Sequence, residues 1–332
     1  MLDKNKQLLN FYANNMFSEF RGIDLLEIIS IIENTSLTYR DSLNLPRNVT
    51  FGVEIEYENL EKKIVDKYVS ENLKKWDSKS DTSVSHGGEV ASDILNDSKT
   101  DWNNLKKICE FLKKKSVIYN GTAGGHIHID KDILNNDVDS WRLFFKTYCI
   151  YENILFRFGY NDRVGPRKGI KTYASNISVM FYDSLLIFKE EDWKYKLIKK
   201  MGYDKDIAVN FQNVRFDDSS KKRNTIEFRF PNGTFEEIIW QNNINAFTKI
   251  LLSSKNKTID EEFLDYKINN NEIAFKYDKN SYNEIDLRNA LEFVDLIFDN
   301  NLDKIYFLRQ YFKDFTTCFG KENIVKAKRF VK

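Results

Sequence analysis

Polar and apolar residues alternate in three short segments of the chain, and ionisable side chains occupy every second position in each. The segments are 52–57 (GVEIEY), 124–130 (GGHIHID) and 225–230 (TIEFRF). Because successive side chains of a β-strand point to opposite faces, each segment is predicted to be a strand with one charged and one apolar face. The three charged faces could line one site.

Helical spacing of apolar residues predicts four helices in the middle of the chain, and a β-hairpin lies between the first two. The helices are expected over 62–75, from a cap at Thr100 or Asp101 to about 115, over 139–158, and from a capping box at 234–237 to about 252. The hairpin is expected over 76–95, with its turn at His86-Gly87-Gly88. Residues 177–188 and 208–216 are predicted to form further strands.

Both ends of the chain have helical patterns. Helix-compatible apolar runs fill much of 1–47, and the strongest helical segments near the other end are 287–298 and 305–315. We therefore expect a helical N-terminal extension (1–47), a mixed catalytic domain (48–253) and a helical C-terminal region (254–332) packed on that domain. Within the mixed domain, the basic, glycine-containing segment 161–171 has the composition of a mobile loop.

Composition narrows the class of protein. The chain has 332 residues with 51 Lys and Arg against 50 Asp and Glu, so it lacks the basic excess that a nucleic-acid partner would require. Cys109, Cys149 and Cys318 are odd in number and far apart, which fits neither a disulfide framework nor a clustered zinc site. With no apolar signal core and no run of about 18 apolar residues, we expect a cytoplasmic protein without membrane partners.

The predicted charged faces carry two kinds of metal ligand. They are Glu54, Glu56, His126, His128 and Glu227, and two of the three histidines of the chain are among them. Carboxylates are costly to bury without compensation, so we expect a cation beside them. Oxygen-rich surroundings favour Mg²⁺ or Mn²⁺ over zinc. The simpler alternatives are an exposed strand face for the glutamates and a chance surface pair for the histidines.

Further charged residues flank this set. Arg229 could direct its guanidinium to phosphate or form only a surface ion pair with Glu227. Asp81 and Glu89, on either side of the predicted hairpin turn, could be structural or could add oxygen ligands. His86 is expected to be a solvated loop histidine. The run 221–223 (KKR) is most simply a solvated loop, with steering of acidic substrates as the alternative.

The order of these motifs resembles the amidoligase family. Glu-x-Glu is followed by a hairpin with Asp and Glu eight residues apart, then Gly-Gly-His-x-His, then Thr-x-Glu-x-Arg and a Asn-Gly-Thr cap. The resemblance covers about 50–252. It implies an α+β fold, in which a curved, mainly antiparallel sheet of the glutamine synthetase catalytic type has helices on its outer face and helical regions at both ends.

The resemblance also implies roles for residues. An ATP-dependent ligase of this kind holds two or three Mg²⁺ or Mn²⁺ ions, one bound by Glu54, His126 and Glu227 and another, beside the substrate, by Glu56, Glu89 and Asp81. His128, Arg229 and Asn210 would bind the nucleotide, and Arg229, Glu89 and Arg163 would act in catalysis. Asp81 stands where related enzymes use Glu, and Ser92-Asp93 where they often have Ser-Pro.

These roles predict an ATP- and Mg²⁺-dependent ligase that joins a carboxylate to an amine through an acyl phosphate. No P-loop and no dinucleotide fingerprint is present, so metals and basic residues would hold the nucleotide. The substrates could be small molecules, peptides or protein side chains, and the chain could form a homo-oligomer. A metal-dependent hydrolase and a non-catalytic nucleotide-binding relative remain the alternatives.

Overall fold

The computed structural model describes residues 25–81, 83–84, 86–115, 121–217, 224–270 and 284–313. The predicted helical run before residue 25, the basic run 221–223 and Cys318 lie outside these ranges.

An antiparallel sheet forms the centre of the molecule. In the described ranges it has seven strands in the order β2-β3-β1-β5-β7-β6, with β4 paired to β1. The strands are β1 (Thr50–Tyr57), β2 (Trp76–Lys79), β3 (Gly88–Ser92), β4 (Leu95–Asn96), β5 (Gly125–Asp130), β6 (Val209–Asn210) and β7 (Thr225–Phe228). The three alternating segments are thus the neighbouring strands β1, β5 and β7, and the α+β class and the hairpin of β2 and β3 are confirmed.

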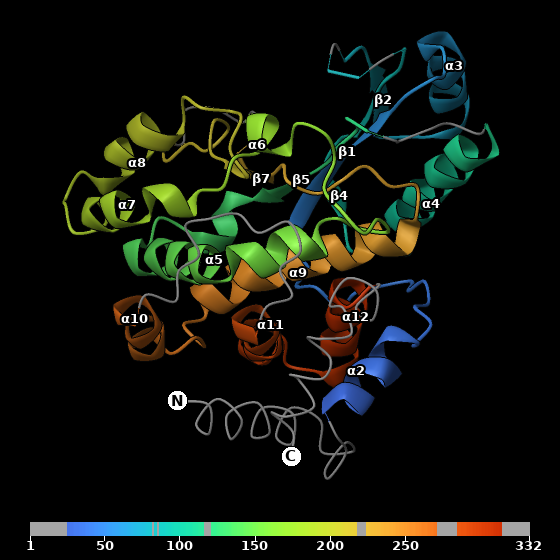
Figure 1. The fold of residues 1–332 in the computed structure, drawn as a ribbon. Coiled ribbons are helices and arrows are strands. Elements are labelled where there is room, and N and C mark those ends of the chain that lie inside the picture. The colour runs from blue at the N-terminus through green and yellow to red at the C-terminus, as the bar shows by residue number, and fades with distance from the viewer. Residues whose placement is uncertain are drawn as a thin grey trace.

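The apolar face of the sheet packs on two long helices, α5 (Val138–Phe158) and α9 (Glu237–Lys255). Phe228 of β7 stacks on Phe247 of α9 with ring centroids 4.4 Å apart and meets Phe144 of α5 edge-on. Both helices run along the same side of the sheet (Figure 1). Covering this face leaves the opposite, charged face to form the site.

A second layer of helices lies on the far side of α5 and α9 from the sheet (Figure 1). It contains α2 (Leu25–Glu33), α10 (Glu261–Asn269), α11 (Glu284–Ile297) and α12 (Asn301–Tyr311). Phe307 of α12 stacks on Phe158 at 4.2 Å, which joins this layer to α5. The predicted helices at 287–298 and 305–315 are confirmed within the described residues.

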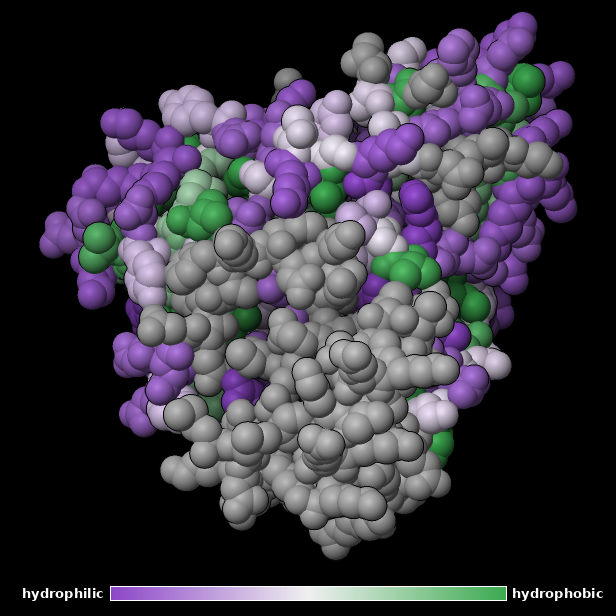
Figure 2. All heavy atoms as spheres, in the orientation of Figure 1, coloured by the Kyte–Doolittle hydropathy of each residue, from purple (hydrophilic) through white to green (hydrophobic). Residues whose placement is uncertain are grey.

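The remaining helices surround the sheet. They are α3 (Lys62–Asn72), α4 (Lys99–Lys114), α6 (Ile170–Tyr173), α7 (Phe181–Ile187), α8 (Trp193–Met201) and the short 3₁₀ helices Lys131–Leu134 and Ser178–Met180. Hydrophilic side chains dominate the surface over α3, α4, α7 and α8 on the face shown in Figure 2. Among the helices described, none combines the length and the apolar composition needed to cross a bilayer.

Several sequence predictions are wrong in detail. The predicted strand 177–188 is a 3₁₀ turn followed by α7, whose buried residues Phe181, Ser184 and Ile187 recur every three positions. The predicted strand 208–216 shrinks to the two residues of β6, Val209 and Asn210. Both segments contain closely spaced apolar residues. This pattern is common to short buried helices and short buried strands, so it does not distinguish the two.

Two helix caps also differ from the prediction. Ser98, rather than Thr100 or Asp101, caps α4 and accepts a hydrogen bond from the Asp101 N–H at 3.2 Å. Thr234 accepts from the Glu236 N–H at 3.1 Å, two residues away, so no capping box forms. The predicted helices themselves are confirmed, because their apolar spacing matches the faces that pack inward.

Candidate metal centre

Strand register brings the charged residues together on one face of the sheet. Glu54 pairs with His126 across β1 and β5, and His128 pairs with Glu227 across β5 and β7. Directly opposed residues of antiparallel strands project from the same face, so these side chains meet. The charged residues of the three alternating segments therefore share one face of the sheet, as the alternation predicts.

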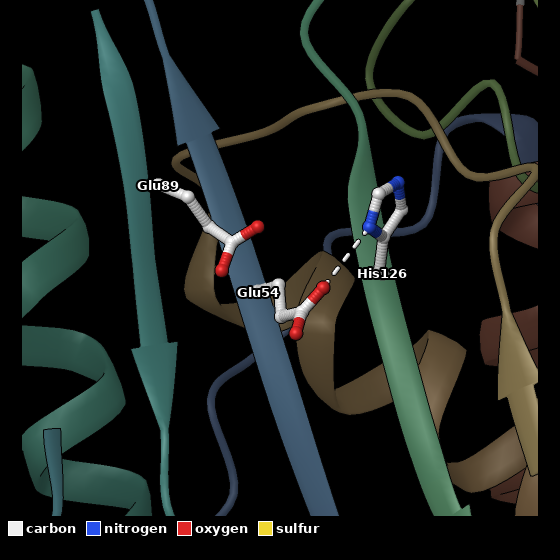
Figure 3. Close-up of side chains that lie close together, drawn as sticks. All are labelled: Glu54, Glu89 and His126. Carbon is white, nitrogen blue, oxygen red and sulfur yellow. Dashed lines mark hydrogen bonds and ion pairs between the residues drawn. The ribbon is translucent and has the colours of Figure 1, made fainter. Parts of the chain in front are cut away.

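One group of potential ligands comprises Glu54, Glu89 and His126, from three adjacent strands (Figure 3). One ligand atom from each lies within 4.8 Å of the others. The Oε2 atom of Glu54 is 3.2 Å from Nδ1 of His126. Two carboxylates and an imidazole at this spacing are a donor set that Mg²⁺ or Mn²⁺ would accept.

A second group comprises Glu54, His128 and Glu227, again within 4.8 Å. Here the other oxygen of Glu54, Oε1, lies 3.3 Å from Nε2 of His128. Glu54 therefore belongs to both groups and presents a different oxygen to each. A carboxylate placed in this way can bridge two cations.

The electrostatics of these groups favour bound cations. Burial alone would raise the pKa of Glu54, but hydrogen bonds from His126 and His128 hold it well below its usual value. Burial, followed by the charge of Glu54, raises the pKa of Glu89 to about 7. Closely spaced acidic groups that oppose each other's ionisation are stabilised by a metal ion. The donor set present therefore fits a divalent metal.

Asn210 and Arg229 lie beside the second group. The Asn210 amide donates to Oε2 of Glu227 at 2.7 Å, and Nη1 of Arg229 donates to Oε1 at 2.6 Å. Burial would raise the pKa of Glu227, yet the charges of His128, His126 and Arg229 lower it. The position of Arg229 also suits contact with an anion bound above the sheet.

Three predicted residues lie outside the two groups. Glu56 pairs in register with Glu89, but its Oε2 accepts the Gly124 N–H. Asp81 lies in the loop after β2 and accepts from the Ser83 N–H at 2.7 Å. Arg163 is half-buried in the loop after α5.

The site contains an arginine that sequence reasoning missed. Arg167 is only 3% exposed, and its Nη1 lies 3.7 Å from Oε2 of Glu56. The basic loop 161–171 and the Gly124-Gly125 pair were the available signals. A Cβ at Gly124 would lie 1.9 Å from Nη1 of Arg167, so the room left by this glycine is filled by the guanidinium.

A cavity of about 1140 Å³ opens next to the second group. Gly52, Glu54 and His128 contribute to its lining, and Arg215 and Phe216 line it as well. A Cβ at Gly52 would meet Ser92 Oγ at 3.5 Å, an ordinary contact, while a larger side chain would extend toward the cavity. The cavity joins a charged end to partly apolar walls, as a nucleotide would require.

The fold and this charged face define an α+β protein with a carboxylate and histidine centre on an open antiparallel sheet. The family model described as "putative amidoligase enzyme" matches residues 62–251, which is more than half of the chain. The chain therefore belongs to this family, which indicates an enzyme with ligase activity. No curated protein sequence matches the chain.

Proposed function

We propose that the chain is an ATP- and Mg²⁺-dependent ligase that forms an amide bond between a carboxylate and an amine. Membership of the amidoligase family supports a ligase. The observation that carries the proposal is the position of Glu54, which contributes one oxygen to each of two groups of ligands. Paired divalent ions suit phosphoryl transfer, in which positioning and charge neutralisation supply most of the catalysis.

In this proposal Glu54 would belong to the ligand sets of both ions. Glu89 and His126 would complete one set, and His128 and Glu227 would complete the other. When bound, the ions neutralise the phosphate oxygens and the developing charge on the transferred phosphoryl group. This division differs from the one that the resemblance implies, because His128 joins a ligand set rather than contacting phosphate alone.

The other residues of the site would bind the nucleotide or substrate, or hold a metal ligand in place. Arg229 would contact the phosphates, and Asn210 holds the Glu227 carboxylate in place. The nucleotide would occupy the cavity, with Phe216 packing against the base. Arg163 remains a candidate for the substrate side of the centre.

The chemistry needs no covalent nucleophile from the protein. The substrate carboxylate attacks the γ-phosphorus of ATP, the bond to the β–γ bridging oxygen breaks, and ADP leaves. The amine then attacks the acyl carbon and loses a proton, and inorganic phosphate leaves. Each amide bond formed therefore yields one ADP and one phosphate.

Product analysis with defined mixtures of acids and amines tests this proposal. ADP and phosphate should accumulate only when ATP, Mg²⁺, an acid and an amine are all present. Glu54→Gln should abolish turnover, whereas Glu71→Gln, on the exposed side of α3, should not change it. Bond cleavage without ATP would instead support the metal-dependent hydrolase, and full turnover by Glu54→Gln would refute the proposed centre.

Binding can be tested before the substrates are known. Mg²⁺ with a non-hydrolysable ATP analogue at about 100 times its Kd should stabilise the chain by roughly 2.7 kcal/mol. A thermal-shift titration measures this, with Glu54→Gln as the variant that should lose the shift. The absence of a shift in the wild-type chain across a wide concentration range would contradict nucleotide binding.

A further inference from the structure

Glu56 lies opposite Glu89 in the strand register, and its carboxylate contacts three other groups. Its Oε2 accepts the Gly124 N–H and lies 3.7 Å from Nη1 of Arg167. Its Oε1 lies 3.4 Å from Nε2 of His126. Glu56 is 2% exposed, so this carboxylate is neutralised inside the protein by a fixed guanidinium.

The imidazole of His126 has two distinct sides. Its Nδ1 faces Glu54 at 3.2 Å and Glu227 at 3.6 Å, and its Nε2 faces Glu56. In metal sites, the ring nitrogen that does not bind metal commonly meets a carboxylate that fixes the orientation of the ring. Glu56 stands on that side of His126, with Oε1 3.4 Å from Nε2 but with no hydrogen bond between them in this structure.

Arg167 is fixed from several directions. Its backbone N–H donates to Oδ1 of Asn232 at 2.8 Å, and its Nη2 donates to the Arg229 carbonyl at 2.9 Å. Gly124 leaves the space that the guanidinium occupies, since a Cβ there would lie 1.9 Å from Nη1. A buried arginine held in this way provides a charge that cannot move away when a metal binds.

We propose that Arg167 is a positioning residue that neutralises Glu56, and that Glu56 in turn orients His126 rather than binding a metal ion itself. The centre would then hold two ions that share Glu54, without a third ion at Glu56. This inference rests on the proposed metal centre, but it concerns metal binding and can be tested without substrates.

Removing Arg167, the buried ion-pair partner of Glu56, distinguishes a Glu56 that orients His126 from a Glu56 that binds a metal ion. If Glu56 orients His126, Arg167→Met leaves its carboxylate uncompensated, and Mn²⁺ affinity should fall by about 10- to 100-fold, the usual effect of losing a residue that supports a metal ligand. If Glu56 were itself a ligand, freeing it from Arg167 should strengthen Mn²⁺ binding. Arg167→Lys, which keeps the charge, should recover part of the affinity.

Mn²⁺ titrations followed by calorimetry and by electron paramagnetic resonance would measure both affinity and stoichiometry. Two ions per wild-type chain are expected. Lys168→Met is the matched control, because it removes one charge from an exposed neighbour in the same loop. An affinity in Arg167→Met equal to that of Lys168→Met, or higher, would overturn the proposal.

Glu56→Gln keeps the test decisive if Arg167→Met does not fold. Glutamine retains an oxygen that can accept from the Gly124 N–H, so the variant should still bind two Mn²⁺ ions per chain. The loss of one ion in Glu56→Gln, or a third ion in the wild-type chain, would show that Glu56 is a ligand. Failure of the ligase proposal would appear differently, as intact Mn²⁺ binding without ADP formation.

Discussion

A buried glutamate in α5 makes the stability of the fold depend on pH. Glu152 is 2% exposed, and its two carboxylate oxygens accept the backbone N–H groups of Ile177 and Ser178 at 2.7 and 2.9 Å. Burial raises the pKa of Glu152 from 4.5 to about 7, although these hydrogen bonds lower it. The carboxylate therefore ties the segment before α7 to α5 while it remains costly to ionise.

The sign of the effect follows from the direction of the shift. Between pH 4.5 and about 7 the folded chain retains a proton on Glu152 that the unfolded chain has released. Stability contributed by this group is therefore complete below pH 4.5 and is lost as the pH rises toward 7. At about 1.4 kcal/mol per pKa unit, this shift corresponds to a loss of about 3 kcal/mol.

Glu152→Gln should remove this dependence, because glutamine does not titrate. The free energy of unfolding of the wild-type chain minus that of the variant should fall by about 3 kcal/mol between pH 4.5 and pH 8. Urea unfolding followed by circular dichroism at several pH values measures this difference. The contributions of the other titrating groups are the same in both chains and cancel in the difference. Glu71→Gln, exposed on α3, is the matched control variant. A flat or rising difference for Glu152→Gln would refute the reasoning.

Three further substitutions test the core, the cavity and the fixed arginine. Phe228→Ala should lower the free energy of unfolding by about 3–5 kcal/mol in urea, because it empties the stack on Phe247. Gly52→Leu should weaken binding of an ATP analogue in calorimetry, while Gly52→Ala, whose Cβ makes only ordinary contacts, should bind as the wild-type chain does. Gly124→Ala should lower Mn²⁺ affinity in the same titration as Arg167→Met, because the added Cβ would displace the guanidinium.

The charged face could be predicted from the sequence because it depends on a local rule. Alternation puts Glu54, His126 and Glu227 on one side of their strands whatever the strand order. Which strands become neighbours depends on long-range pairing, and the order of the motifs supplied that information only through the resemblance to a family. The register that sets Glu54 opposite His126 came from the structure.

Arg167 illustrates what the sequence could not reveal. Its burial depends on the Gly124 backbone, the Asn232 side chain and the Arg229 carbonyl, which come from two separate parts of the chain. Composition alone made the segment 161–171 a mobile, positively charged loop. A charged side chain can be buried when groups from distant parts of the chain compensate its charge. The local sequence around the side chain does not reveal those groups.

The distribution of fixed cations explains why metal binding should centre on Glu54. Glu56 has Arg167 beside it, Glu89 has Lys79 at 3.4 Å, and Glu227 has Arg229 at 2.6 Å. In the described ranges of the chain, the ion-pair partners recorded for Glu54 are two imidazoles, which are charged only when protonated. Within these residues Glu54 therefore has no lysine or arginine as an ion-pair partner, so it lacks the fixed positive charge that the other three carboxylates have beside them. A divalent ion on either side would supply it, and sharing Glu54 between two ions would use both of its oxygens.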